Sequence, residues 1–442
     1  MSAEGVTAID RRRALATLAT WVGGAAGTAA LPGCGGGGSS GSSGSTRMRA
    51  LNLTSDLPSI DLLTDDTNRY AALASATMSD YLSFDAATVA LKVRRAGDAT
   101  QLYSSSFVLA KDEVYTAVVW GRETSLRVHT LPEDAVDTDI TDGAARLRVF
   151  NATIDAGSLD VYVTSATADI AESAALQSAL AGGTLGSYRD LSAGTFRLRV
   201  TGAGDPTDLR LDVSSFVLAN RKHATLVITA GASGVLVDGV LIPLQGTATV
   251  MKNTQARVRV VAGVAGAGNV AVTVGGQVVA GGYRSPTVGP YTRVTAGTVD
   301  VVVRLDGGSP STASLTLVPG TDYTLLVTGS AGAARLQPLT DDNRVPVTAS
   351  RAKVRLVHGV AGLDPLTLSV DYLPVATDLA EGAASTPATL ASSAAARVDV
   401  TAASAAQPVY SVDSVNLQTG SVYTVFVLGG NTAPTGVIRK ER

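Results

Sequence analysis

The sequence predicts an all-β protein built from tandem β-sandwich modules, and three repeated features support this fold class. The first feature is a basic-x-Arg motif followed by an apolar run, which begins at positions 47, 146, 257 and 353. Successive copies are separated by 99, 111 and 96 residues, which is the length of a small sandwich domain. The motif therefore predicts four modules, with the boundaries 47–143, 144–253, 254–350 and 351–442.

The second and third features are strand patterns that recur within each module. Apolar and polar residues alternate at 59–63, 158–163, 269–274 and 365–370, as expected for half-buried strands. Later in each module a turn leads into an apolar strand, and three of these strands open with a tyrosine: Tyr115, Tyr323 and Tyr423. The position of these residues predicts tyrosine corners, in which the hydroxyl bonds to backbone at the end of a sandwich.

The composition agrees with an all-β fold. Hydrophobic residues make up 45% of the chain and aromatic residues only 5%, so the cores must consist mainly of Val, Leu, Ala and Thr. Val and Thr favour strands because their branched side chains are stiff at χ1. We expect about seven short strands in each module, with short surface helices possible at 167–180 and 377–384. The net charge is −3 without a clustered basic face, so we expect no nucleic-acid partner.

The first 33 residues have the pattern of a signal peptide. Arg11, Arg12 and Arg13 precede an apolar, small-residue stretch that ends at Leu31. A transmembrane anchor is the alternative, but it would need about 20 strongly apolar residues, whereas this stretch is rich in Ala, Gly and Thr. The arginine run also resembles a twin-arginine export signal without its usual Phe, so both this route and the general secretory route stay open.

Cys34 is the only cysteine, which excludes a disulfide within the chain. The sequence Leu31-Pro32-Gly33-Cys34 resembles the bacterial lipobox, and this resemblance implies that Cys34 is lipidated and anchors the protein to a membrane. A run of Gly and Ser follows, so residues 34–46 are expected to form a lipidated, flexible tether. Because Gly35 follows the cysteine, the resemblance implies a bacterial cell-envelope lipoprotein sorted to the outer membrane, on its periplasmic or its outer surface.

Taken together, the repeated motifs resemble a known family. The run Ala-Arg-Leu-Arg-Val-Phe-Asn-Ala at 145–152, the strand at 159–163, the segment Ala-Gly-Thr-Phe-Arg-Leu-Arg-Val at 193–200 and the later Tyr-Thr pairs are similar to domain of unknown function 4397. The similarity is strongest in modules 2 and 4. It implies an immunoglobulin-like fold in bacterial exported or surface proteins, and it supplies no activity and no site residues.

Few residues have the spacing of a metal or catalytic site. His129, His223 and His358 fall at different places in the repeat, without zinc-ligand spacing, and we expect them to be partly exposed. By our alignment, His358 ends its strand where the other modules have Leu53, Ala152 and Gly263. Acidic residues gather at the joint between modules 1 and 2, and the weak calcium candidates there are Asp137, Asp139 and Asp142. The alternative is a solvated linker that holds no metal, and we expect neither a metal site nor a cofactor.

These observations favour a non-catalytic lipoprotein of the cell envelope that acts as a structural, adhesive or interaction array. Its expected partners are the membrane, through Cys34, and an envelope protein or glycan. The alternative is a periplasmic ligand- or carbohydrate-binding protein, for which Trp120, Tyr188 and Tyr291 are the candidate aromatic residues. An enzyme would need a catalytic set assembled across modules, and we do not expect one.

Overall fold

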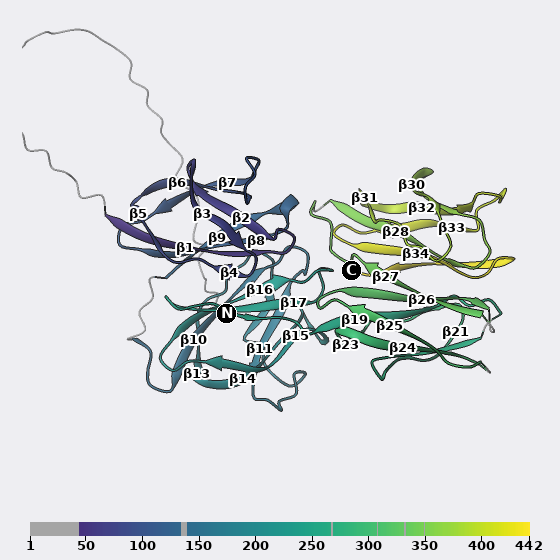
Figure 1. Cartoon of the computed structure of the whole chain (residues 1–442), viewed down its shortest axis with the longest axis horizontal. Helices are drawn as coiled ribbons and strands as arrows, with labels where there is room; N and C mark the ends of the chain where they lie inside the picture. Colours follow the sequence, from purple (N-terminus) through teal and green to yellow (C-terminus); the bar gives the residue numbers. More distant parts are fainter. Residues whose placement is uncertain (1–43, 134–138, 267, 307, 331–332, 349) are drawn as a thin grey trace, which may run out of the picture. The chain divides into compact units, whose positions relative to one another are not determined.

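The computed structural model describes residues 44–442 except 134–138, 267, 307, 331–332 and 349 (Figure 1). Residues Gly44–Arg442 form one compact unit. The expected signal peptide and Cys34 lie outside the described residues. No helix in the described part of the chain is long and apolar enough to cross a membrane.

The described residues are almost entirely strands and turns. Module 1 contains β1 (Ser45–Thr54), β2 (Ser59–Thr64), β3 (Thr67–Ala74), β4 (Thr77–Met78), β5 (Leu82–Asp85), β6 (Ala87–Arg95), β7 (Gln101–Leu109), β8 (Val114–Gly121), the 3₁₀ turn η1 (Glu123–Ser125) and β9 (Arg127–Pro132). Module 2 contains β10 (Ala144–Ala152), β11 (Leu159–Thr164), β12 (Gln177–Leu180), β13 (Arg189–Ser192), β14 (Gly194–Gly202), β15 (Asp205–Leu218), β16 (His223–Ala230), β17 (Val237–Pro243) and β18 (Thr249–Met251).

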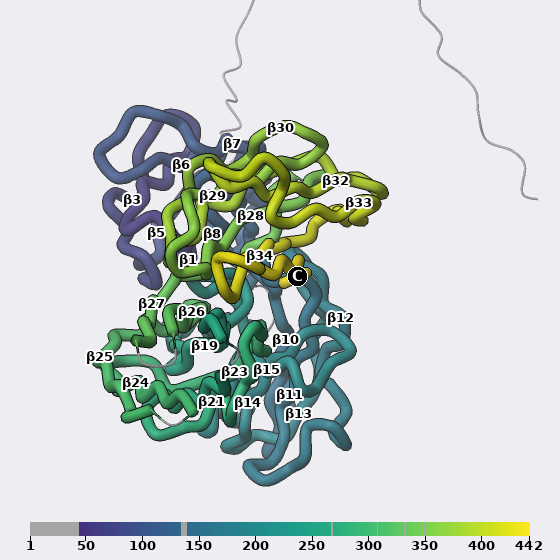
Figure 2. Tube along the Cα trace, turned by 90° about the vertical axis from the view of Figure 1, so that its right-hand side faces the viewer, coloured from purple at the N-terminus to yellow at the C-terminus, as the bar shows by residue number. Residues whose placement is uncertain are grey.

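The second half of the chain repeats this order, and Figure 2 follows the trace through each segment. Module 3 contains β19 (Gln255–Ala262), β20 (Asn269–Val274), β21 (Gln277–Arg284), β22 (Thr287–Val288), β23 (Thr292–Thr295), β24 (Gly297–Leu305), β25 (Ser311–Leu317), β26 (Asp322–Ser330) and β27 (Ala333–Asp341). Module 4 contains β28 (Arg351–Val360), β29 (Leu366–Val370), β30 (Leu373–Leu379), β31 (Ala388–Ala391), β32 (Ser393–Ala402), β33 (Tyr410–Leu417), β34 (Val422–Gly430) and β35 (Ala433–Lys440).

Each module contributes two sheets with the same strand order. In module 1 the order is β4-β1-β8-β9, with β5 also paired to β1, and β3-β2-β6-β7 in the second sheet. The strand that carries the basic-x-Arg motif pairs in parallel with the strand that contains the corner position, which is a tyrosine in modules 1, 3 and 4 and Ala224 in module 2. These parallel pairs are β1 with β8, β10 with β16, β19 with β26, and β28 with β34.

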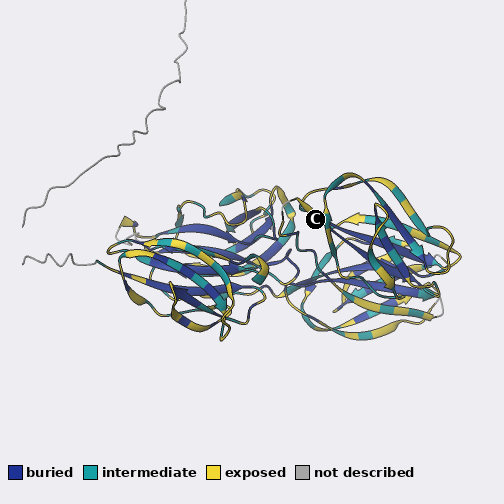
Figure 3. Ribbon diagram, turned by 90° about the horizontal axis from the view of Figure 1, so that it is seen from above, coloured by how far each residue is buried: buried dark blue, intermediate teal, exposed yellow. Residues whose placement is uncertain are grey.

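A separate apolar core lies between the two sheets of each module, and the buried strand segments are dark blue in Figure 3. In module 3, Val258, Val260, Val272 and Val301 are fully buried together, which illustrates a core of small, branched side chains. The all-β sandwich class predicted from the sequence is thus confirmed.

The prediction of two short surface helices is wrong. Residues 167–176 form turns and bends before β12, and residues 377–384 contain the end of β30 and a turn. Asp169 gives the physical reason in the first case, because its carboxylate accepts the Ala171 amide at 2.9 Å and its carbonyl accepts the Ser173 hydroxyl at 2.5 Å. Such local side-chain bonds compete with a helical ladder.

The tyrosines that open β8, β26 and β34 act as corners. The hydroxyl of Tyr323 accepts the Val318 amide at 3.0 Å. In module 4 the Tyr423 hydroxyl accepts the Gln418 amide at 3.0 Å and donates to the Asn416 carbonyl at 2.8 Å. Each ring therefore ties the start of its strand to the preceding turn, as the sequence predicts.

Replacing Tyr423 by Phe removes both of these hydrogen bonds and keeps the buried ring. We expect the free energy of unfolding to fall by about 1 kcal/mol, measured by urea unfolding, because the Gln418 amide and the Asn416 carbonyl lose a hydrogen-bond partner. Tyr372→Phe is the matched control, since Tyr372 is 76% exposed and its loss of a hydroxyl should change little. Equal stability of the two variants would contradict a corner role for Tyr423.

Candidate functional site

The sheet that contains the motif strand is buried on both of its faces. In β1, Met48 and Ala50 point into the core of module 1, whereas Leu51 and Leu53 belong to a second apolar cluster. That second cluster joins module 1 to module 2 through side chains such as Phe150. A corresponding cluster joins modules 3 and 4. The modules are therefore packed in pairs, 1 with 2 and 3 with 4, and we call each contact between paired modules a seam.

The second basic residue of each motif is a buried arginine in a seam. These seam arginines are Arg49, Arg148, Arg259 and Arg355, and their exposed fractions are 3%, 9%, 2% and 2%. In every module the arginine Nε donates to the threonine that follows the corner position on the parallel strand. The acceptors are Thr116, Thr225, Thr324 and Thr424, at 2.8, 2.9, 2.8 and 3.1 Å.

The seam arginines of modules 3 and 4 reach reciprocally into the partner module. Arg259 of module 3 binds the Glu441 carboxylate of module 4 at 2.8 Å. Arg355 of module 4 binds the Asp341 carboxylate of module 3 at 2.5 Å. Asp341 also accepts hydroxyl hydrogen bonds from Tyr291 and Thr324, both at 2.6 Å. The seam therefore holds two buried ion pairs.

The seam of modules 1 and 2 is built less symmetrically. Arg49 pairs with Glu133 of its own module at 2.9 Å and donates to the Gly246 carbonyl of module 2 at 2.5 Å. Arg148 reaches back to the Pro132 carbonyl of module 1 at 3.0 Å. Module 2 has Leu244 where modules 1, 3 and 4 have a carboxylate, as the equivalent backbone bond of Leu244 to His223 shows. Four seam arginines thus share three carboxylates.

The candidate aromatic residues for carbohydrate binding lie at these seams. Trp120 is 4% exposed and packs edge-on against Phe150. Tyr188 and Tyr291 are half-buried, and the guanidinium groups of Arg148 and Arg259 lie over their rings at 4.6 and 4.5 Å. These rings are occupied by contacts within the protein, so they do not form an exposed sugar-stacking platform.

Two of the three histidines are buried, contrary to expectation. His223 is 2% exposed and His358 is fully buried. By strand register, the positions equivalent to His358 are Asn52, Asn151 and Ala262, which corrects the alignment by one residue. His358 makes hydrogen bonds equivalent to those of Asn52 and Asn151. Its Nδ1 accepts the Val360 amide at 3.3 Å, and its Nε2 bonds to the Asp364 carbonyl at 3.2 Å.

The acidic joint between modules 1 and 2 is only partly described. Asp137 lies outside the described residues. Asp139 forms an ion pair with Arg146 at 2.6 Å, and Asp142 accepts a hydrogen bond from Asn220 at 2.8 Å. Within the ranges that the structure describes, no group of three or more His, Cys, Asp or Glu residues could hold a metal ion. The expectation of no metal site at this joint, with calcium as the weak alternative, stays a prediction.

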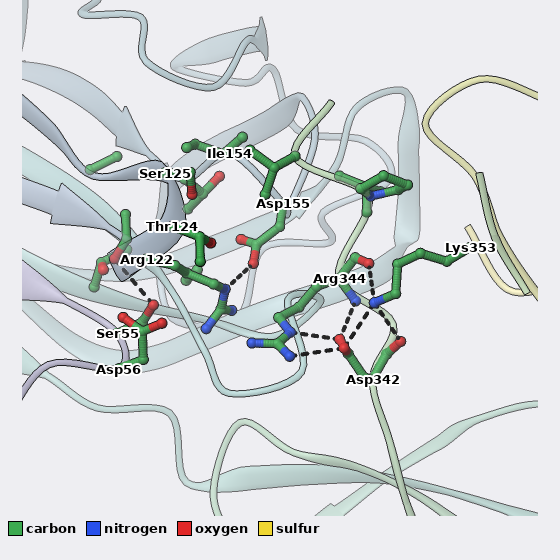
Figure 4. A pocket seen from close by; sticks show the side chains of 18 of the residues that line it. Ser55, Asp56, Arg122, Thr124, Ser125, Ile154, Asp155, Asp342, Arg344 and Lys353 are labelled. Atoms are coloured by element: carbon green, nitrogen blue, oxygen red, sulfur yellow. Dashed lines mark hydrogen bonds and ion pairs between the residues drawn. The ribbon is translucent and has the colours of Figure 1, made fainter. Parts of the chain in front are cut away.

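Sequence reasoning missed a cavity of about 370 Å³ that is lined by modules 1, 2 and 4 and by residues 342–347, which follow β27 and are called the linker below (Figure 4). The loops after β8 and β10 contribute Arg122 and Asp155, which form an ion pair at 2.6 Å. The linker contributes Asp342 and Arg344, whose ion pair also measures 2.6 Å. The residues involved are far apart in the sequence, and the packing of modules 1 and 2 against the linker and module 4 brings them together.

Lys353 adds a third cation to the wall of this cavity. Its ammonium group lies 2.8 Å from Asp342 and donates to the Arg344 carbonyl at 2.9 Å. Burial lowers the pKa of Lys353, and the neighbouring cations Arg344 and Arg355 lower it further, against the effect of Asp342. Burial alone would raise the pKa of Asp342, but its hydrogen bonds to Arg344 and Lys353 hold that pKa well below the usual range.

The cavity offers binding groups of mixed character. Ser55, Thr124 and Ser125 supply hydroxyls, and an apolar side is formed by Ile154, Val345, Pro346, Val347 and Pro387. The described lining residues include no histidine or cysteine. This combination can hold a small polar molecule, and it contains no serine–histidine or cysteine–histidine pair for nucleophilic chemistry.

The buried pair of Arg259 and Glu441 provides a stability test of the seam. Arg259→Met should lower the free energy of unfolding by about 3 kcal/mol, measured by urea unfolding, because it leaves the 5% exposed Glu441 carboxylate without its cation. Arg335→Met is the control, since Arg335 pairs with Glu381 at 3.6 Å but is 76% exposed, and it should change stability by less than about 1 kcal/mol. Similar losses in both variants would rule out a special contribution of the seam.

We expect His358 to make the stability of module 4 depend on pH. Burial lowers its pKa below the usual value of about 6.5, so the unfolded chain binds a proton more readily than the folded one. The contribution is therefore complete above pH about 6.5 and declines as the pH falls towards the folded-state pKa. His358→Asn, which introduces the residue found in modules 1 and 2, should reduce the loss of stability between pH 7.5 and 5.5. An unchanged pH dependence in urea unfolding would refute this assignment.

Comparison with known proteins places this architecture in a family. The family model described as Domain of unknown function (DUF4397) matches residues 46–162 and 256–361, which together are just over half of the chain. Each match starts at the first strand of modules 1 and 3 and continues into the first strands of the partner module. Both matches thus contain both motif strands of a seam. The matched regions begin in modules 1 and 3 and include only the first part of modules 2 and 4.

Other comparisons add little to this family match. No curated protein matches the chain. Among solved structures, the chain is similar to one described as the Bacillus anthracis TIE protein, with 10% sequence identity and a TM-score of 0.15, over 84% of this chain and 68% of that chain. At this TM-score the likeness supports no inference. The chain belongs to the family called Domain of unknown function (DUF4397).

Proposed function

We propose that this protein is a non-catalytic lipoprotein of the bacterial cell envelope, in which paired sandwich modules act as a structural or adhesive array. The observation that carries the proposal is the seam, with its buried arginines and apolar clusters between paired modules. Such contacts make two modules move as one body, which suits a spacer better than freely jointed domains would.

The proposed address rests on the N-terminal sequence. Cys34 is the proposed lipid attachment site, and the Gly/Ser run from 35 to 45 is the proposed tether between the membrane and β1. The outer membrane is the proposed location, and an envelope protein or a glycan is the proposed partner. An array held out from a membrane can also add weak contacts through avidity.

A second candidate function is the binding of a small ligand in the periplasm. The cavity formed by modules 1, 2 and 4 is the specific observation that favours it, because its volume of about 370 Å³ lies within the usual range for ligand sites. The two functions are compatible, since a structural array can also hold a ligand between its modules.

Lipidation can be tested directly by metabolic labelling with palmitate. The wild-type protein should incorporate the label, and Cys34→Ser should abolish labelling and release the protein from the membrane fraction, because no other cysteine exists. Ser39→Ala in the tether is a matched control that should be labelled normally. Label retained in Cys34→Ser would refute the anchor and, with it, the proposed location.

The array function can be tested by deleting the gene and measuring surface attachment and envelope integrity. We propose that at least one of the two falls and is restored by the wild-type protein but not by Cys34→Ser. If both properties are unchanged in the deletion strain, the structural and adhesive function is refuted.

A further inference from the structure

The wall of the cavity formed by modules 1, 2 and 4 carries three cations and three carboxylates. Its cations are Arg122, Arg344 and Lys353, and its less exposed carboxylates are Asp155 and Asp342. Asp342 alone serves both Arg344 and Lys353. The third lining carboxylate, Asp56, is exposed, so water and salt screen its field. One cation of the wall therefore has no carboxylate of its own in a sheltered position.

The hydrogen bonds of the two arginines leave one side of each guanidinium available. Arg122 uses Nε for Asp155 and Nη2 for the Gly231 carbonyl. Arg344 uses Nε and Nη2 for the two oxygens of Asp342. Among the described residues, neither Nη1 group has a hydrogen-bond partner. Figure 4 shows both side chains extending into the same space from opposite sides, the first from module 1 and the second from the linker.

We propose that this cavity binds a small molecule with a carboxylate or phosphate group, held between Arg122 and Arg344. Guanidinium groups bind such oxyanions through charge-assisted hydrogen bonds, and two of them on one cavity supply both charge and direction. The anion also adds a negative charge near Lys353, which shares the carboxylate of Asp342 with Arg344. This inference deepens the ligand-binding alternative, and its failure would leave the anchored array untouched.

The remaining lining residues define the rest of the ligand. The hydroxyls of Ser55, Thr124 and Ser125 can bond to hydroxyl groups, while Ile154 and Pro346 offer an apolar surface. A volume of about 370 Å³ accommodates a molecule about as large as one or two sugar units. The ligand class is therefore a polar, hydroxylated molecule with one oxyanion, such as an acidic sugar or a phosphorylated polyol.

The experiment measures ligand binding to the full-length chain. The Cys34→Ser substitution is included so that the protein is not held at the membrane. Isothermal titration at low ionic strength compares D-glucuronate with glucose, and glycerol 1-phosphate with glycerol. The first comparison identifies a carboxylate ligand and the second a phosphate ligand. We expect saturable 1:1 binding of at least one anion, at least tenfold tighter than that of its neutral analogue.

Two variants locate the binding in the cavity. Val347 is 52% exposed at the cavity lip, so Val347→Trp should block entry without disturbing the fold, and its control is Val217→Trp at another exposed position. Arg344→Gln removes one guanidinium, and its control is the exposed Arg335→Gln. We expect affinity to fall at least tenfold in both cavity variants and to stay within twofold in both controls.

The results can also overturn the proposal. If neither anion binds the wild-type chain, or if the neutral analogues bind equally well, the cavity is not an oxyanion site. If Val347→Trp and Arg344→Gln retain wild-type affinity while thermal unfolding shows them to be folded, the anion binds elsewhere. Any of these outcomes refutes the assignment.

Discussion

The hydrogen bond from each seam arginine to the threonine on the neighbouring parallel strand is the contact on which the rest of the architecture depends. It aligns the motif strand with the strand that follows the tyrosine corner, with the same register in all four modules: Arg49 opposite Thr116, Arg148 opposite Thr225, Arg259 opposite Thr324, and Arg355 opposite Thr424. Since the guanidinium is buried, its remaining donors must also find acceptors. Each seam arginine has at least one such acceptor in the partner module, so the same side chain that sets strand register also joins the modules.

A buried arginine that joins two modules needs a counter-charge and hydrogen-bond acceptors, and the two seams supply these in different ways. In modules 3 and 4 they are two reciprocal carboxylates, Glu441 and Asp341. Modules 1 and 2 have one carboxylate, Glu133, and complete the set with the carbonyls of Pro132 and Gly246. A carbonyl neutralises no charge, so the first seam depends more on its apolar cluster, which includes Trp120 and Phe150.

Much of the fold could be predicted from the sequence, because strand alternation, turns and corner tyrosines are local patterns. The seam could not be predicted in this way, since it joins residues such as Arg49 and Thr116 that lie 67 positions apart. One signal was nevertheless present: the run from Ala145 to Ala152 contains apolar residues at consecutive positions, and consecutive burial indicates a strand covered on both faces. From the sequence, His358 aligns with Ala152, one residue after its true equivalent, Asn151. The sequence misses the equivalence because Asn151 and His358 make similar hydrogen bonds but are chemically different side chains.

The candidate cavity illustrates how a repeat can acquire a difference without losing its fold. The second basic residue of the motif is an arginine in every module, and its contact with threonine leaves it no freedom. The first basic residue is not restricted in this way: Arg146 pairs with Asp139 and Asp190, and Arg257 with Asp322. In module 4 this position is Lys353, which turns instead to Asp342 in the cavity wall. The position that the seam leaves free thus supplies one of the three cations of the cavity wall, so the charge of the wall can change within one motif without disturbing the seam.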